Sequence, residues 1–212
     1  MGRQFAKIAF TPLVKKQQEL HGSRRQYQRI EQAGEPSVWL GEDERAFIEA
    51  RDGFYMASVS ETGWPYIQFR GGPKGFLHVL KDNTLGFADL RGNKQYISVG
   101  NLQHDDRVAL FLMDYVGQQR LKILGRTKIF EGNQEAQELI TKLRTAEHNG
   151  VPERAITISV EAFDWNCPQH ITPRFTAEEI EPMVAALRSE VAALKAENVA
   201  LRRAQQSQPG TS

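Results

Sequence analysis

Short apolar runs of β type, separated by turn residues, follow one another through the middle of the chain. They are residues 54–60, 66–70, 76–81, 84–89, 107–115 and 120–131. Turn residues at 61–63 and 81–83 separate neighbouring runs, so we expect those strands to pair antiparallel. Ile156, Ile158 and Val160 alternate on one face of a last strand. The spacing predicts a small antiparallel barrel of six to seven strands with flanking helices, an α+β chain that is mainly β.

Helix signals lie before and after these strands. Pro12 stands where a helix can begin, and residues 42–50 are expected to form a short helix with Phe47 and Ile48 as its apolar contacts. Asn133 can cap a helix that runs to about residue 147, where Asn149, Gly150 and Pro152 would stop it. We therefore expect an N-terminal helical arm (1–46), a barrel domain (47–175), a C-terminal helix (176–205) and a disordered tail (206–212).

The composition limits the classes of protein that the chain can belong to. A net charge of +1 gives no overall attraction to nucleic acid or membrane, and one cysteine excludes an internal disulfide framework. The longest apolar run, Val108–Met113, is much shorter than the roughly 20 residues that span a bilayer. We expect a soluble, cytoplasmic protein without nucleic-acid or membrane partners.

The first thirty residues are nevertheless basic. They hold seven Lys or Arg against Glu19 alone. Such an arm can meet nucleic acid or anionic lipid, but a solvated helix packed on its own protein or on a partner subunit is the favoured interpretation.

Two polar runs carry the chemistry. Residues 87–96 leave a predicted strand, and Arg91, Gly92, Asn93 and Lys94 within them offer two cations, an open backbone and a side-chain amide, which are the groups that hold a phosphate. The second run, Asn166-Cys-Pro-Gln-His-Ile-Thr-Pro-Arg174, also leaves a strand-like segment.

With Trp64–Gly72, these runs resemble the FMN-binding split β-barrel family related to pyridoxamine 5'-phosphate oxidase, over residues 47–174. The resemblance implies FMN bound between the subunits of a homodimer. It assigns the phosphate and ribityl chain to Arg70, Asn93, Lys94 and Gln95, and it places Gln68, Asp89 and Tyr96 nearer the ring or chain. Gly71 either lets the backbone approach the ligand or serves only a hairpin turn. Near the flavin edge the resemblance places Trp165, Asn166, Cys167, Gln169, His170 and Arg174.

The resemblance implies an FMN-dependent oxidoreductase in which NAD(P)H reduces the flavin and electrons pass to free flavin, oxygen, a quinone or another small acceptor. His170 is the candidate proton donor, although a loop-orienting histidine is the favoured interpretation. Alternatives are a non-catalytic flavin-binding module and pyridoxamine 5'-phosphate oxidation. The latter is weakened because Gly71-Gly72-Pro73 and Gly92-Asn93-Lys94 depart from the motifs of those oxidases. FAD and a deazaflavin remain alternative cofactors.

Other ligand classes lack their motifs. No Gly-x-Gly-x-x-Gly opens a helix after a strand, and no Gly-x-Ser-x-Gly elbow is present. Cys167 and His170 have Cys-x-x-His spacing without the further ligands that a metal needs, so we expect no metal site.

The C-terminal segment has a seven-residue repeat that is independent of the family resemblance. Ile180, Leu187, Leu194 and Leu201 take position d, and Val184, Val191 and Asn198 take position a. Such a pattern favours a parallel two-stranded coiled coil, in which Glu190 and Glu197 at g face Lys195 and Arg202 at e of the partner. A helix folded back on its own barrel is the alternative. The acidic stretch before the repeat excludes a basic-zipper DNA-binding protein.

Overall fold

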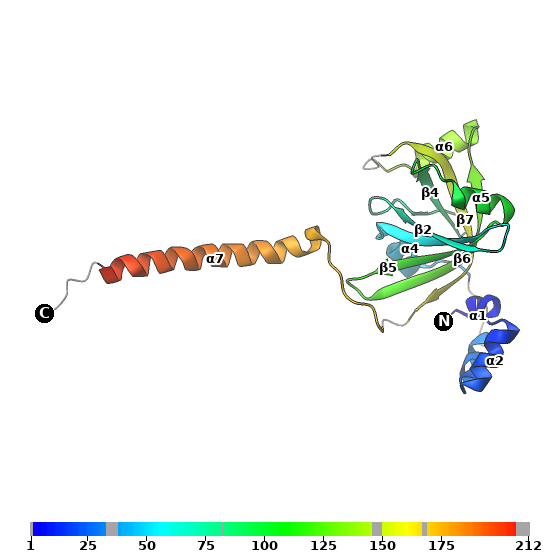
Figure 1. Ribbon diagram of the computed structural model, residues 1–212, viewed down its shortest axis with the longest axis horizontal. Helices are drawn as coiled ribbons and strands as arrows, with labels where there is room; N and C mark the ends of the chain where they lie inside the picture. Colours follow the sequence, from blue (N-terminus) through cyan, green and yellow to red (C-terminus); the bar gives the residue numbers. More distant parts are fainter. Residues whose placement is uncertain (1, 33–37, 82, 146–149, 167–168, 207–212) are drawn as a thin grey trace. The chain divides into compact units, whose positions relative to one another are not determined.

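The computed structural model describes residues 2–32, 38–81, 83–145, 150–166 and 169–206, and for residues 204–206 it describes the backbone alone. The chain divides into two compact units after Ile171. The first unit contains a seven-stranded sheet with helices, and the second contains one long helix (Figure 1).

All seven strands pair antiparallel in one sheet, in the order β2-β1-β5-β6-β7-β4-β3. The sequence-based prediction of an antiparallel sheet of six to seven strands with flanking helices is therefore confirmed. The strands are β1 (Gly53–Val59), β2 (Pro65–Gly71), β3 (His78–Val79), β4 (Thr84–Leu90), β5 (Arg107–Asp114), β6 (Gln119–Phe130) and β7 (Pro152–Trp165).

Two strands differ from their predicted lengths. The run predicted over residues 76–81 pairs only at His78 and Val79, while Phe76 and Leu77 are buried in the core outside the ladder. In contrast, β7 extends well beyond its alternating apolar residues because it has two partners, β4 along its first half and β6 along most of its length. The register between β6 and β7 shifts at Leu124/Gly125. A Cβ on Gly125 would lie 2.6 Å from the Ser159 carbonyl oxygen, so glycine is needed at this irregularity.

The core lies inside the curved sheet and follows the strand alternation. Phe54 of β1 stacks on Phe76 with ring centroids 5.8 Å apart and meets the Phe87 ring of β4 edge-on at 5.5 Å. Helix α4 (Glu42–Glu49) adds Phe47 and Ile48, as the sequence predicted. The same cluster contains Met56, Leu85, Leu110, Leu112, Leu121, Ile123, Ile156 and Ile158.

Helix α6 (Gln134–Leu143) begins as predicted, because the Asn133 side chain accepts a hydrogen bond from the Ala136 N–H at 2.8 Å. It ends four residues before the predicted residue 147, since Arg144 is already extended at φ −75°, ψ 126°. The predicted stop residue Asn149 lies outside the described residues. Helix α5 (Ile97–His104) was not predicted, because its sequence has little helical periodicity and includes β-branched residues and a glycine.

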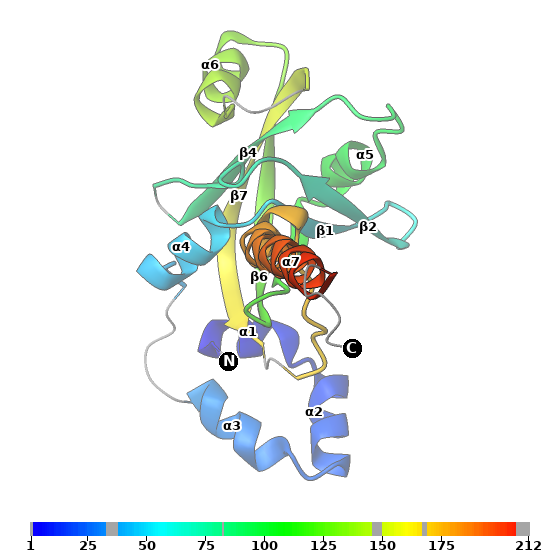
Figure 2. The ribbon, with the colours of Figure 1, turned by 90° about the vertical axis from the view of Figure 1, so that its left-hand side faces the viewer.

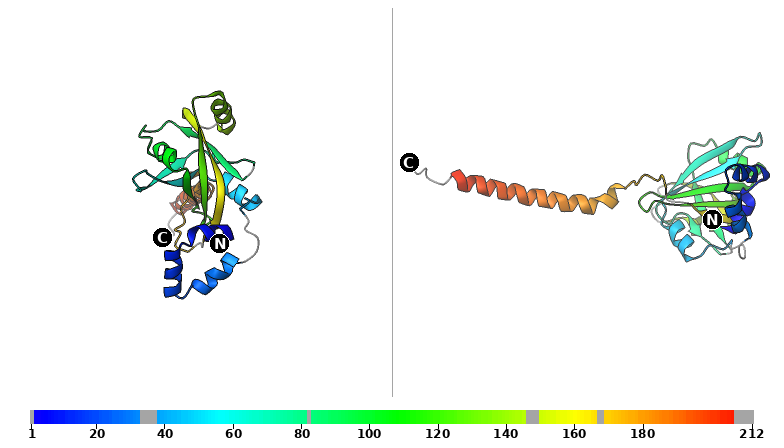
Figure 3. Two further views of the ribbon diagram at one scale, coloured as in Figure 1. Left: turned by 90° about the vertical axis from the view of Figure 1, so that its right-hand side faces the viewer. Right: turned by 90° about the horizontal axis from the view of Figure 1, so that it is seen from below.

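The N-terminal segment forms α1 (Arg3–Ala9), α2 (Pro12–Leu20) and α3 (Arg24–Gln32), which group beside the C-terminal end of β7 (Figures 2 and 3). Phe5 and Ala6 are buried, and the Lys122 ammonium lies 4.8 Å from the centroid of the Phe5 ring. Lys15 and Arg24 both pair with Glu31. The basic arm therefore packs on its own protein through α1, which was the favoured interpretation.

Helix α7 (Ala177–Gln206) is a single 30-residue element with Pro182 inside it. In the described part of the chain, no helix has both the length and the apolar character required to cross a bilayer.

Candidate functional site

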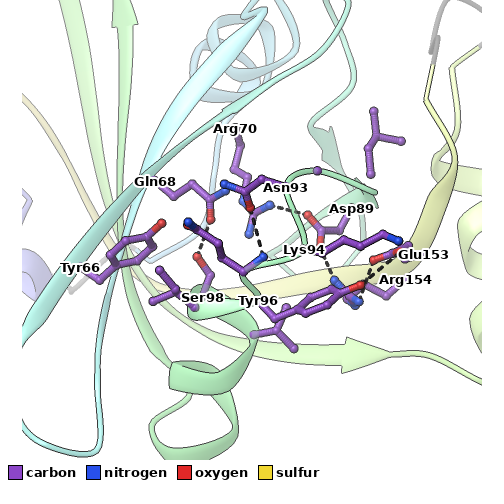
Figure 4. Close-up of a pocket in the computed structure, with 15 residues that line it drawn as sticks. Tyr66, Gln68, Arg70, Asp89, Asn93, Lys94, Tyr96, Ser98, Glu153 and Arg154 are labelled. Atoms are coloured by element: carbon purple, nitrogen blue, oxygen red, sulfur yellow. Dashed lines mark hydrogen bonds and ion pairs between the residues drawn. The ribbon is translucent and has the colours of Figure 1, made fainter.

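A pocket opens between β2, the end of β4, the loop that follows β4, α5 and the start of β7 (Figure 4). The alternation of β2 builds one wall, because Tyr66, Gln68 and Arg70 face the pocket while Ile67 and Phe69 face outward. The pocket is lined by Tyr66, Gln68, Arg70, Asp89, Leu90, Gly92, Asn93, Lys94, Gln95, Tyr96, Ile97, Ser98, Val99, Glu153 and Arg154. Seven of the candidate residues from the sequence are thus brought together.

Asp89 is the central charge of the pocket. Its Oδ1 accepts a hydrogen bond from Arg70 Nη1 at 2.5 Å, and its Oδ2 accepts one from Arg154 Nη1 at 2.9 Å. All three side chains are largely buried, with 13, 4 and 9% of Arg70, Asp89 and Arg154 exposed. The carboxylate therefore fixes two guanidinium groups, one from β7, the neighbour of β4, and one from β2 (Figure 4). Because β2 is not a neighbour of β4 in the sheet, the sheet must curve to bring Arg70 to Asp89.

Arg154 joins this pair to the rim of the pocket. It also bonds Glu131 at 3.0 Å and Glu153 at 3.1 Å. Burial acts to lower the pKa of Arg154, but hydrogen bonds to Glu131 and Asp89 act against it, and the pKa is raised overall. The group remains a cation at every physiological pH.

Glu153 anchors the loop that follows β4. Its Oε1 accepts hydrogen bonds from Arg91 Nε at 2.8 Å and from the Tyr96 hydroxyl at 3.4 Å. The hydrogen bond from Arg91, with the nearby charge of Arg154, lowers the pKa of Glu153 below its usual range. The ring of Tyr96 lies under the Arg154 guanidinium, with 5.2 Å between the guanidinium carbon and the ring centroid.

The loop itself has an unusual backbone. Lys94 and Tyr96 both adopt positive φ, at 61° and 51°, which side chains other than glycine seldom do. The Asn93 side chain accepts a hydrogen bond from the Gln95 N–H at 3.2 Å. Tyr96 is the N-cap of α5 and makes no side-chain cap hydrogen bond, the first turn of α5 contains no acidic residue, and its residues Ile97, Ser98 and Val99 line the pocket. Left-handed turns and helix N-termini of this kind attract anions.

Two hydrogen bonds fix α5 against the sheet. Ser98 Oγ donates to Gln68 Oε1 at 2.7 Å, and the Asn101 side-chain amide donates to Ser58 Oγ at 3.0 Å. The carbonyl oxygen of Gln68 therefore accepts from α5 and links the helix to β2.

The pocket has room for a small polar group but not for a whole nucleotide. Its cavity volume is ≈ 50 Å³, enough for a few water-sized groups and far below the roughly 300 Å³ at which small-molecule pockets begin. Arg70, Lys94 and Arg154 outweigh Asp89 and Glu153 by one positive charge. The Arg70 Nε–H is buried and has no acceptor among the described residues, so the cation is incompletely satisfied.

The second polar run lies elsewhere in the same protomer. Trp165 ends β7, while Arg154 lies near its start, and a strand rise of about 3.3 Å per residue places them roughly 35 Å apart along β7. The Trp165 indole N–H donates to Glu44 Oε1 at 2.7 Å, and the backbone N–H of Asn166 donates to the Arg120 carbonyl at 3.1 Å.

The remaining residues of that run follow Asn166 in the chain. Gln169 and His170 are exposed, and His170 has a positive φ of 66°. Cys167 lies outside the described residues, and Arg174 belongs to the second compact unit. Trp165, Asn166, Gln169 and His170, which the structure describes in the first unit, therefore do not line the pocket of their own protomer.

Gly71 has a packing role that the sequence did not reveal. A Cβ at this position would lie 2.8 Å from the Phe69 ring, and one at Gly53 would lie 2.3 Å from it. Both glycines make room for the outward aromatic side chain of β2.

Arg154, Glu153, Ser98 and Tyr66 line the pocket but were not candidates from the sequence. For Tyr66 a usable signal existed, since its alternation with Gln68 and Arg70 places it on the same side of β2. Arg154 and Glu153 stand in no recognisable motif. Their place in the pocket depends on how β7 is arranged beside β4 in the sheet.

The fold and pocket define a split-barrel protein with a small polar pocket, and the chain belongs to the pyridoxamine 5'-phosphate oxidase family, whose model matches residues 40–164. No curated protein matches the sequence significantly.

Solved structures with a similar fold include HupZ of Group A Streptococcus, with 14% identity and a TM-score of 0.49 over 65% of this chain and 100% of that chain. They also include an F420 reductase (17%, TM-score 0.42, 59% and 98%) and a FAD-binding protein of Mesorhizobium loti (16%, TM-score 0.41, 59% and 94%). At these identities the likeness concerns the fold and carries no argument about activity.

Proposed function

We propose that this protein is an FMN-dependent oxidoreductase that holds the FMN phosphate in the pocket between β2, β4 and α5. The observation that carries the proposal is the convergence of Arg70, Lys94 and uncapped N–H groups of α5 on one small, largely polar cavity. Lys94 has no ion-pair partner among the described residues, so its charge is available to a ligand. Arginine and lysine together neutralise a phosphate dianion.

The flavin ring requires more space than this pocket offers, and a second copy of the chain is the proposed source. Members of the family commonly dimerise and bind flavin. Because the second polar run lies far along β7 from the pocket, we place Trp165, Asn166, Cys167, Gln169, His170 and Arg174 of one copy near the ring bound at the pocket of the other. FMN would then lie at the subunit interface of a homodimer.

The outer face of β2, β1 and β5 is suited to this pairing. Phe69 lies opposite Tyr55, which lies opposite Phe111, and the two aromatic rings of Phe69 and Tyr55 are 5.4 Å apart. Ile67 is 61% exposed and Phe69 57% exposed. A continuous apolar sheet face of this kind is usually covered by another protein surface.

A bound flavin supplies a reversible two-electron carrier, and the chain's residues orient it and exclude water. The proposed donor is NADH or NADPH, and the acceptor is a small molecule such as free flavin, oxygen or a quinone. Asp89 and Arg154 are held in mutual ion pairs, so their role is to position the phosphate-binding groups. His170 is proposed to orient the loop of the second run, with proton donation as its alternative role.

The decisive experiment is an anaerobic visible spectrum of the purified protein after FMN is added and the excess removed, before and after NADH and then NADPH. A flavin band that bleaches and returns with oxygen supports the oxidoreductase. A band that persists with both donors indicates a flavin-binding module without turnover. Absence of any band, with FAD and F420 tried in parallel, contradicts the cofactor assignment.

The dimer has its own test. Phe69→Asp should dissociate the protein and weaken FMN binding, whereas Val116→Asp, at an exposed position in the β5–β6 turn, should do neither. Equal molar masses by light scattering for the parent and Phe69→Asp would contradict the proposed interface.

A further inference from the structure

The apolar side chains of α7 form one exposed stripe. Leu187 is 60% exposed, Val191 47%, Leu194 56% and Leu201 57%. An apolar groove runs between Val184, Leu187, Val191 and Ala192, with Arg188 and Lys195 at its margins. Leucine and valine side chains that are exposed to this extent along a 30-residue helix mark a surface that contacts another protein surface.

We propose that α7 forms a parallel, in-register, two-stranded coiled coil with α7 of a second copy. The stripe repeats every seven residues, and the structure shows one continuous helix across all of the repeats. Valine at position a with leucine at d is the combination that favours two strands, and Asn198 is the single polar residue in the a series.

The charges beside the stripe determine the orientation of the two helices. In a parallel coil, position g of one helix faces e of the other, so Glu190 meets Lys195 and Glu197 meets Arg202. In an antiparallel coil, g would face g and e would face e, which sets glutamate against glutamate and lysine or arginine against its like. Both flanks therefore favour the parallel arrangement.

The start of the helix defines where the coil begins. Thr176 and Glu179 form a reciprocal capping box, in which the Glu179 N–H donates to Thr176 Oγ1 at 3.2 Å and the Thr176 N–H donates to Glu179 Oε2 at 2.8 Å. Pro182 then removes one N–H from the helical ladder and crowds the carbonyl of Glu178. Ile180, which the heptad pattern places at d, precedes this proline, so the coil extends over Val184–Leu201.

A coil of that length is about 27 Å long and is marginal for two free helices. When two copies are already joined through the proposed interface at β2, β1 and β5, their α7 helices meet within one assembly. The helices then pair at a high effective concentration. The register of the coil does not depend on flavin, so the proposal is tested independently of the cofactor.

Disulfide trapping in the full chain tests both pairing and direction. In a Cys167→Ala background, Leu201→Cys places a thiol at d near one end of the coil, where only a parallel, in-register pair brings the two copies together. We expect most of the chain to form a covalent dimer on mild oxidation at micromolar concentration. The matched control, Ala196→Cys at the outer f position, should stay unlinked.

Charged substitutions at the core provide the second measurement. Leu187→Glu with Leu194→Glu should abolish trapping through Leu201→Cys, whereas Ser189→Glu with Ala196→Glu, both at f, should preserve it. Failure of Leu201→Cys to link, or equal linking of Ala196→Cys, overturns the parallel coil. A trapped species whose parent mass corresponds to three or four chains overturns the two-stranded assignment. FMN binding measured on the same variants shows separately whether the cofactor proposal holds.

Discussion

Arg70 on β2 and Asp89 on β4 form a 2.5 Å ion pair, although their strands are not neighbours in the sheet. Asp89 also pairs with Arg154 on β7, so one buried carboxylate joins three strands at the mouth of the pocket. A phosphate entering this mouth must share the Arg70 guanidinium with Asp89. The pair therefore links two non-neighbouring strands, and under the proposed function it also sets the strength of phosphate binding.

The first prediction concerns Arg70. Arg70→Ala should weaken FMN binding by roughly 1.5–3 kcal/mol, about tenfold to a hundredfold, because a charge-assisted hydrogen bond to the phosphate is lost. Quenching of FMN fluorescence on titration with protein measures it. Arg107→Ala is the control, since Arg107 is exposed and pairs with Asp105 outside the pocket. Unchanged affinity in folded Arg70→Ala protein would mean that the phosphate lies elsewhere.

Asp89→Asn separates the contribution of Asp89 to stability from its effect on FMN binding. The substitution leaves two largely buried arginines with a neutral partner, so we expect the free energy of unfolding to fall by roughly 3 kcal/mol. FMN affinity should stay equal or increase, because Arg70 no longer shares its charge with a carboxylate. Urea unfolding of the FMN-free protein and FMN titration measure the two effects. A loss of affinity in the folded variant would show that the positioning of Arg70 by Asp89 outweighs the charge that the carboxylate withdraws from it.

Lys94 combines a binding charge with a strained backbone. Lys94→Ala and Lys94→Gly should weaken FMN binding equally, because both remove the ammonium group. The glycine variant should be more stable than the alanine variant by about 1 kcal/mol, since φ is +61° at this position and glycine adopts it without a Cβ clash. Thermal unfolding of the FMN-free proteins provides the comparison. Equal stability of the two variants would mean that the loop relaxes out of the left-handed conformation.

The pH dependence of stability should report on Glu153. Its pKa is lowered in the folded protein, chiefly by Arg91, so its contribution is fully present above the ordinary value of 4.5 and is lost as the pH falls through the folded pKa. Thermal midpoints should therefore decrease on acidification below about pH 4.5, and Glu153→Gln should decrease less over the same range. Parallel decreases would assign the acid sensitivity to other carboxylates.

The sequence predicted local features well and tertiary closure poorly. Alternation and turn residues located six strands within one or two residues, and Asn133 marked a true helix cap. Arg154 could not be found this way, because its place beside Asp89 arises from the register in which β7 pairs with β4, and no local pattern encodes that register. Helix α5 was missed for a related reason: Ser98 and Asn101 hold it through bonds to β2 and β1, while its own sequence favours no helix.

Prediction of the candidate site met the same limit, because residue types could be read from the sequence and their arrangement in space could not. The polar run at residues 91–96 could be recognised as anion-binding from its residue types, and the structure adds the positive φ angles and the uncapped α5 that no pattern encodes. The place of Trp165 near a flavin rests on the resemblance and stays a prediction, while the structure adds that its indole N–H donates to Glu44 within the protomer.

Asn198 tests what a polar residue contributes to the α7 stripe. Asn198→Val should raise the thermal midpoint of helix unfolding, followed by circular dichroism at 222 nm, because valine is the better packing residue at position a. The same change should loosen oligomer specificity, so light scattering should reveal species larger than the parent dimer. Ala196→Val, at the outer f position, controls for the helix propensity of valine and should change neither quantity. A strict dimer both before and after Asn198→Val would argue against the specificity role, and a monomeric parent would contradict the coiled coil itself.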